Sequence, residues 1–175
     1  MWFKFLAIFL AIFLASVVQA SFLAHFTILG NSANLVFVVF AVVIFYECIL
    51  NRLWPREFYK EIMVVVVAGF FADLFSSFSF GLSIAIFLVL YLAIKTAIYF
   101  LKEIPDRYLI VYFLAVFAPS FFAYHAVLGI ISNNLRVNTA FFIALAYNIV
   151  LAAALFYFYK KIDSIKSGRQ LKLFH

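Results

Sequence analysis

Residues 82–101 read LSIAIFLVLYLAIKTAIYFL, a run of 20 residues in which Lys95 is the only charged side chain. A helix rises 1.5 Å per residue, so about 20 apolar residues are needed to cross the roughly 30 Å of hydrocarbon in a bilayer. This stretch therefore predicts a membrane-spanning helix.

Similar apolar runs recur on both sides of this stretch. They occupy residues 5–26, 35–50, 62–78, 108–131 and 139–159. The runs are apolar all round, whereas the strands of a membrane barrel alternate apolar and polar residues. We therefore predict an all-α integral membrane protein: one domain over residues 1–160, a compact bundle of about six transmembrane helices, and a basic cytoplasmic tail over residues 161–175.

The composition supports a membrane protein independently of the spans. Hydrophobic residues make up 69% of the chain and charged residues only 11%, whereas a soluble domain has about 25% charged residues. In water, 26 Phe would leave apolar surface that a chain of this length could not bury. The single cysteine, Cys48, excludes an internal disulfide. We read the net charge of +6 as basic residues gathered in cytoplasmic loops, so no nucleic-acid partner is expected.

The orientation follows from the positions of the 13 basic residues. With the N-terminus inside, Arg136 alone lies outside and Lys95 lies within a span. Cytoplasmic loops are enriched in Lys and Arg, so both termini are predicted to be cytoplasmic. The remaining basic residues all fall on the inner side: Lys4, Arg52, Arg56, Lys60, Lys102, Arg107, Lys160, Lys161, Lys166, Arg169 and Lys172.

The N-terminal segment has an alternative interpretation. Lys4, an apolar run and the small-residue ending Val18-Gln19-Ala20 resemble a cleavable signal peptide. The apolar residues continue through Leu29, which favours a retained first helix. Cleavage would leave five spans in the same topology.

Two charged residues lie deep in the predicted spans. Asp73 is the only acid well inside a span, and a charge at membrane depth is costly. Counted from the turn near Ser79, Asp73 lies about 9 Å deep and Lys95 about 22–24 Å deep. We therefore expect no Asp73–Lys95 bridge, and we expect Lys95 to extend to the cytoplasmic headgroups.

Asp73 has two possible roles. His125 lies at a similar depth of about 9 Å in the fifth span, and Gln19 lies in the outer part of the first span. These three residues could form one polar cluster that receives a ligand, an ion or a partner. Alternatively, Asp73 braces the turn that contains Ser76, Ser77 and Ser79. The sequence leaves both readings open.

Three further features concern helix packing. Asn148, near the middle of the sixth span, is expected to form an interhelical hydrogen bond. Pro119 is expected to kink the fifth span, because proline cannot donate to the preceding turn. Ala7, Ala11 and Ala15 recur at four-residue spacing, a stripe that would let another helix approach closely, either inside the bundle or from a partner.

Motifs of enzymes are absent from the sequence. It contains no Gly-rich phosphate loop, no paired-cysteine metal spacing, no His-Glu-x-x-His and no Gly-x-Ser-x-Gly. An intramembrane aspartyl protease needs two cooperating carboxylates. We therefore expect no catalytic residues, cofactor or metal, and we expect a scaffold or a binding protein.

Two segments carry a resemblance to a known family. Residues 69–82, GFFADLFSSFSFGL, contain Gly69, Asp73 and Gly81 and resemble the signature of the rod shape-determining protein MreD family. Gln19, followed by SFLAHFTILGNSANLVFVV, is similar to the first hairpin of that family. The high Phe content and Lys95 depart from its pattern.

The resemblance implies a multi-pass, non-enzymatic component of the bacterial cytoplasmic (inner) membrane. Such proteins work with MreC, and with RodA, a penicillin-binding transpeptidase and MreB filaments, in cell elongation, cell shape and peptidoglycan synthesis. The alternative is the substrate-binding S-component of an energy-coupling-factor vitamin transporter, which also has six helices and a small-residue stripe on the first helix. The few polar residues argue against it, because a vitamin site needs several convergent polar groups. A lipid-modifying enzyme is a third, weaker reading.

Overall fold

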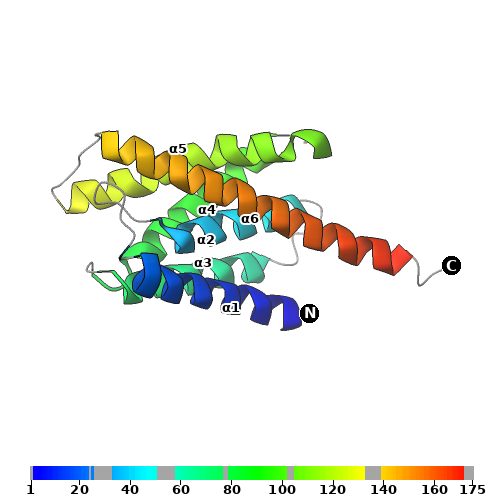
Figure 1. Cartoon of the computed structure of the whole chain (residues 1–175), viewed down its shortest axis with the longest axis horizontal. Coiled ribbons are helices and arrows are strands. Elements are labelled where there is room, and N and C mark those ends of the chain that lie inside the picture. The colour runs from blue at the N-terminus through cyan, green and yellow to red at the C-terminus, as the bar shows by residue number, and fades with distance from the viewer. Residues whose placement is uncertain are drawn as a thin grey trace.

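The computed structural model describes residues 2–23, 25, 33–50, 58–76, 79–101, 105–132 and 139–171, and all of the regular structure in these ranges is helical (Figure 1). The predicted all-α bundle is therefore confirmed. The elements are α1 (Trp2–Val18), the π-helical turn η1 (Gln19–Leu23), α2 (Leu35–Leu50), α3 (Phe58–Leu74), α4 (Leu82–Phe100), the 3₁₀ turn η4 (Asp106–Tyr108), α5 (Leu109–Ile131) and α6 (Thr139–Leu171).

The bounds of α4 and α5 agree with the predicted spans to within one residue, whereas those of α1, α3 and α6 differ. α1 begins at Trp2 instead of Phe5 and continues through η1 to Leu23, and the predicted end of this span, Phe26, lies outside the described residues. α2 begins and ends at the predicted residues. α3 begins at Phe58 instead of Ile62 and ends at Leu74 instead of Phe78. α6 does not end at Tyr159 but continues to Leu171, so much of the predicted tail is helical. The sequence places the start of α3 too late because Lys60 and Glu61 are polar. In the structure the charge of Glu61 is paired with that of Lys95 inside the bundle.

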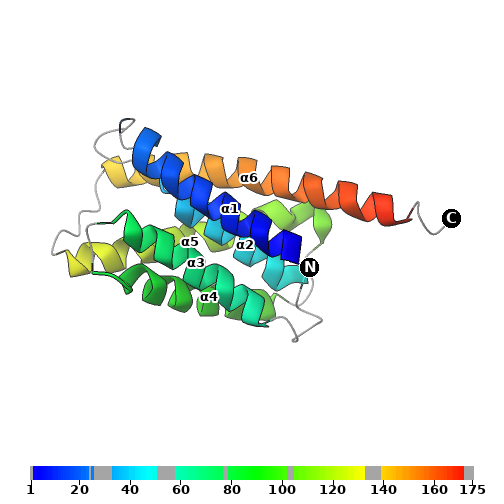
Figure 2. The same cartoon turned by 90° about the horizontal axis from the view of Figure 1, so that it is seen from below.

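Both termini lie at the same end of the bundle, as an even number of crossings requires (Figures 1 and 2). We call this the terminal end, and the opposite end, with the turn between α3 and α4, the turn end. α6 projects well beyond the other helices at the terminal end (Figure 2). Of the residues used to predict orientation, Arg52, Arg56, Lys102, Arg136 and Lys172 lie outside the described residues.

α2 is the central helix and packs against all five of the other long helices. Nearly every side chain from Val36 to Cys48 is buried. At 1.5 Å per residue its 16 residues give a length of about 24 Å, short for a bilayer. A helix enclosed by protein does not have to match the hydrocarbon thickness, because its neighbours shield it from lipid.

The segments long and apolar enough to span a bilayer are Phe5–Leu23, Leu82–Phe100, Leu109–Ile131 and Phe141–Ile162, and Leu35–Ile49 is a shorter apolar helix. The chain is therefore a multi-pass helical membrane protein. Pro119 lies inside α5, which runs unbroken from Leu109 to Ile131. In a membrane bundle, neighbouring helices and Ser or Thr side chains compensate for the backbone bond that proline cannot make.

Stacked aromatic rings fill the interior between α2, α4, α5 and α6. The ring of Phe40 stacks on that of Phe87, with 4.4 Å between centroids, and Phe113 stacks on Phe156 at 4.6 Å. Phe37, which is fully buried, contacts five aromatic rings. Lipid tails are as apolar as Phe, so these rings stabilise the bundle through close packing rather than through removal from water.

Candidate functional site: two buried polar networks

Asp73 caps the start of α4. Its side chain is 4% exposed, and its two carboxylate oxygens accept hydrogen bonds from the backbone N–H groups of Gly81 (2.7 Å) and Ser83 (2.8 Å). The first N–H groups of a helix have no partner within the helix and carry the positive end of its dipole, so a carboxylate there is stabilising. The carboxylate thus braces the turn, one of the two predicted roles. It does so through Gly81 and Ser83, whereas Ser76 binds the Asp73 carbonyl and Ser77 lies outside the described residues.

The two glycines of the same segment are required for different structural reasons. A Cβ added to Gly69 would lie 2.5 Å from the Cα of Ile84, so α3 and α4 cross closely there only because Gly69 has no side chain. Gly81 has φ +95°, a left-handed backbone conformation that favours glycine. Gly69, Asp73 and Gly81 therefore act as one unit that closes the hairpin between α3 and α4.

Tyr124 of α5 joins this hairpin to α2. Its side chain is buried and lies within hydrogen-bonding reach of Ser83 and Asn34. Asn34 in turn caps α2, because its side-chain oxygen accepts the backbone N–H of Phe37 at 3.0 Å. One phenol therefore sits between the N-termini of α2 and α4 at the turn end.

α1 and α6 complete the contacts at this end. The Gln19 side chain accepts the backbone N–H of Val36 at 3.1 Å, and the Asn148 side-chain oxygen accepts the backbone N–H of Asn34 at 2.9 Å. Asn148, which is fully buried, also donates to Ala144 within α6. The predicted interhelical role of Asn148 is confirmed. Side chains from η1, from the residue that caps α2, and from α3, α4, α5 and α6 thus form one turn-end network. It is made of Gln19, Asn34, Asp73, Ser83, Tyr124 and Asn148.

The predicted cluster of Asp73, Gln19 and His125 is only partly correct. Gln19 and Asp73 belong to the turn-end network, but the residue that α5 contributes is Tyr124. The ring of His125 packs against Phe121 at 4.4 Å and Phe141 at 5.8 Å, and its Nε2 is buried without a hydrogen-bond partner among the described residues. Successive helix residues point about 100° apart, so the helix rotation that aims Tyr124 at α2 and α4 turns His125 toward α6.

A second network lies toward the terminal end. Lys95 of α4 donates to Glu61 of α3 at 2.5 Å, and Tyr91 donates to the same carboxylate oxygen at 2.6 Å. Lys95 also lies 2.8 Å from the Tyr91 hydroxyl. Glu61 is in the first turn of α3, where a negative charge complements the helix dipole.

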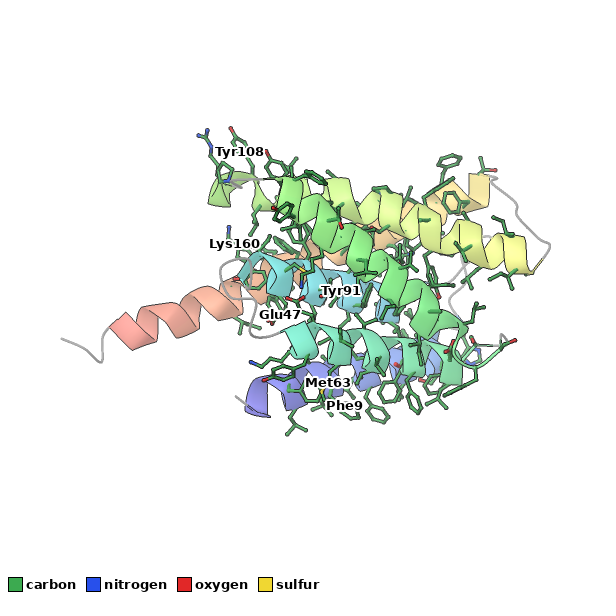
Figure 3. The ribbon with its side chains drawn as sticks, turned by 180° about the vertical axis from the view of Figure 1, so that it is seen from behind. Phe9, Glu47, Met63, Tyr91, Tyr108 and Lys160 are labelled. Atoms are coloured by element: carbon green, nitrogen blue, oxygen red, sulfur yellow. The ribbon has the colours of Figure 1, made fainter. Side chains whose placement is uncertain are left out.

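Glu47 and Cys48 extend this network from α2. Glu47 is buried, and the hydroxyl of Tyr159 on α6 lies 3.5 Å from its carboxylate. Cys48, the next residue, is also buried, and α2 packs here against α3, α4 and α6, the helices that carry Glu61, Lys95 and Tyr159. We call Glu47, Glu61, Tyr91, Lys95 and Tyr159 the terminal-end cluster. Figure 3 shows Glu47 and Tyr91 in the half of the bundle from which α6 projects.

This cluster corrects two predictions. Lys95 does not simply extend to the headgroups, because Glu61 and Tyr91 hold its ammonium group. Asp73 is not the only buried acid, since Glu61 is 2% exposed and Glu47 is 6% exposed. The sequence contained a usable signal: if α3 starts before Lys60, Glu61 enters the bundle and needs a cation at its own depth, and Lys95 is the basic residue there.

The alanine stripe on α1 does not form one packing face. Ala15 is buried, whereas Ala7 and Ala11 are exposed. Four residues advance a helix by about 400°, so a four-residue stripe drifts about 40° at each step. The buried face of α1 is instead formed by Ile12, Ala15 and Ser16.

Chemically, both networks tie helices together. Each residue assigned to the turn-end network or the terminal-end cluster has at least one hydrogen-bond or ion-pair partner within the bundle. Among the described residues, no three His, Cys, Asp or Glu side chains gather in a way that could hold a metal ion.

Comparison of the chain with known families, proteins and structures identifies no relative. The chain matches no protein-family model, no curated protein and no solved structure. Any functional conclusion therefore rests on the residues and geometry of this chain.

Proposed function

We propose that this chain is a non-catalytic scaffold of the bacterial inner membrane that acts with an MreC-like protein in the cell-elongation machinery. The observation that supports the proposal is the hairpin between α3 and α4. Gly69, Asp73 and Gly81, the residues that carry the resemblance to MreD, each serve the closure of this hairpin. A motif whose residues all rigidify one hairpin suits a protein whose task is to present a fixed surface.

The packing of the interior gives further support. Stacked rings such as Phe40–Phe87 occupy the space between the central helices, and the polar side chains of both networks bind one another. A protein that recognises a small molecule instead keeps a concave pocket with a few convergent polar groups. A scaffold role needs no such pocket.

The test is co-purification of the full chain with the MreC-like protein of the same cell, after solubilisation in mild detergent. We expect the two to co-elute, and we expect Asp73→Asn to co-elute as well, because the amide oxygen can still accept one of the two N–H groups of α4. An unrelated single-span membrane protein serves as the control. If the MreC-like protein elutes apart from the unaltered chain, as the control does, the proposal is wrong.

The alternative, an S-component of a vitamin transporter, keeps one observation in its favour. Ala7 and Ala11 are exposed on α1, where a small-residue stripe could receive another helix. Mass spectrometry of the chain purified in mild detergent distinguishes the two functions. A vitamin retained at one per chain would establish the alternative, whereas the scaffold proposal expects only lipid and detergent.

A further inference from the structure

The terminal end carries three pairs of one exposed tyrosine and one basic residue, of which Arg107 and Lys161 are exposed and Lys60 is half-buried. Tyr59 and Lys60 lie at the start of α3, and the Lys60 ammonium is 5.8 Å from the Tyr59 ring centroid. Arg107 and Tyr108 lie at the start of α5, with the guanidinium 4.5 Å from the ring centroid.

The third pair is on α6. Tyr157 and Lys161 are both exposed and lie four positions apart in the sequence. Residues at this spacing share one face of a helix. The three tyrosines are 52%, 44% and 60% exposed in chain order. We call these six residues the rim.

The rim lies at one level along the bundle. Lys60 is in the first turn of α3, Tyr108 immediately precedes α5, and Lys161 is one residue from the end of the apolar segment of α6. Figure 3 shows Tyr108 and Lys160 at the same end of the bundle. Because the apolar segment of α6 ends at Ile162, we expect the boundary between hydrocarbon and headgroups at this level.

The charge of this end is positive even when its acids are counted. The segments 51–60, 101–108 and 160–161 of the sequence contain seven basic residues and three acidic residues, Glu57, Glu103 and Asp106. Tyrosine is favourable at the interface because one end of its ring is apolar and the other is polar. A Lys or Arg beside it supplies the charge that a phosphate group needs.

We propose that the rim binds the phosphate groups of anionic phospholipids in the adjacent leaflet, with one base and one tyrosine at each of three positions. The contact of Arg107 and Lys60 with the neighbouring rings restricts these long side chains before a lipid arrives. That restriction lowers the conformational entropy lost on binding. The lipid would thus be held at α3, α5 and α6, around the terminal-end cluster.

The experiment measures how many lipids the full chain retains in native mass spectrometry when offered equal amounts of phosphatidylglycerol and phosphatidylcholine. The test variant is Lys60→Gln, Arg107→Gln and Lys161→Gln together. The matched control is Lys166→Gln, Arg169→Gln and Lys172→Gln, which removes the same charge from the C-terminal segment. Circular dichroism checks that both variants keep the helical fold.

We expect the unaltered chain and the control to prefer phosphatidylglycerol, and the rim variant to lose that preference. Each basic residue near an anionic surface contributes about fivefold in affinity. Equal retention of both lipids by the unaltered chain overturns the proposal, as does an equal loss in the two variants. So does a rim variant that keeps its lipid preference but no longer co-purifies with the MreC-like protein, because the rim would then dock a protein.

Discussion

At the scale of single residues, the turn end depends on which of two neighbouring side chains faces α2 and α4. Tyr124 faces them and lies beside Asn34 and Ser83, whereas His125 packs among Phe rings with its Nε2 unbonded. Although the two residues are adjacent and similar in size and polarity, replacing them should therefore change the free energy of unfolding by different amounts.

Replacing Tyr124 with Phe should lower the free energy of unfolding by about 1–2 kcal/mol, because a buried hydroxyl is lost and its partners are left less satisfied. Replacing His125 with Phe should leave stability unchanged or raise it, since an unbonded buried nitrogen is removed. Titration of the purified chains with sodium dodecyl sulfate in mixed micelles measures both. A larger loss for the His125 variant would contradict the network described here.

Gly69 supplies a second residue-scale prediction. Gly69→Ala puts a methyl group against the backbone of Ile84, which a side-chain rotation cannot relieve. We expect a loss of about 1–3 kcal/mol in the same titration. Ala93→Val, which adds bulk at an exposed position of α4, is the control and should have little effect. A Gly69 variant as stable as this control would show that α3 and α4 do not cross closely.

The sequence identified Asp73, Gly69 and Gly81 as a unit but could not choose the partner on α5. Depth along a span follows from counting residues, and by depth Tyr124 and His125 are equivalent. Rotation about the helix axis decides between them. That rotation is set by the packing of Phe113, Phe117 and Phe121 against neighbouring helices, which is a tertiary effect.

At the scale of helices, the pairing of α3 with α4 is fixed at both ends. Asp73 binds the start of α4, and Glu61, in the first turn of α3, binds Lys95 toward the other end of the pair. The carboxylate of Glu61 is buried and would be left uncompensated if Lys95 were lost.

Lys95→Met should therefore destabilise the bundle by about 3 kcal/mol, near the low end for a broken buried pair because Lys95 is 40% exposed. The double variant Glu61→Gln with Lys95→Met should be more stable than the single one, since the glutamine can still accept from Tyr91 and no charge is left unpaired. Additive losses in this double-mutant cycle would contradict a coupled pair.

At the scale of the whole molecule, composition and run length were enough to predict a helical bundle and most helix bounds. They could not place the start of α3, because a hydropathy count treats Glu61 as solvent-exposed when it is in fact paired. They also could not show that α2 is the central helix. All the runs are apolar on every side, and the same apolar residue types occur on helix faces that contact lipid and on faces that contact protein. The sequence therefore does not show which helix is enclosed by the others.

The central claim is that α2 and α3 cross the membrane with the other helices and leave both termini in the cytoplasm. If these two shorter helices did not cross, the segment between them would stay outside while the rest of the topology was unchanged. A cysteine at Trp54, in a chain with Cys48→Ala, reports on this segment through labelling by a membrane-impermeant maleimide. Cysteines at Ser132 and Lys161 serve as the external and internal controls.

The account predicts that in intact cells only the Ser132→Cys chain is labelled, and that Trp54→Cys and Lys161→Cys are labelled only after the membrane is permeabilised. Labelling of Trp54→Cys in intact cells would contradict the six-span bundle. Labelling of Lys161→Cys with protection of Ser132→Cys would contradict its orientation.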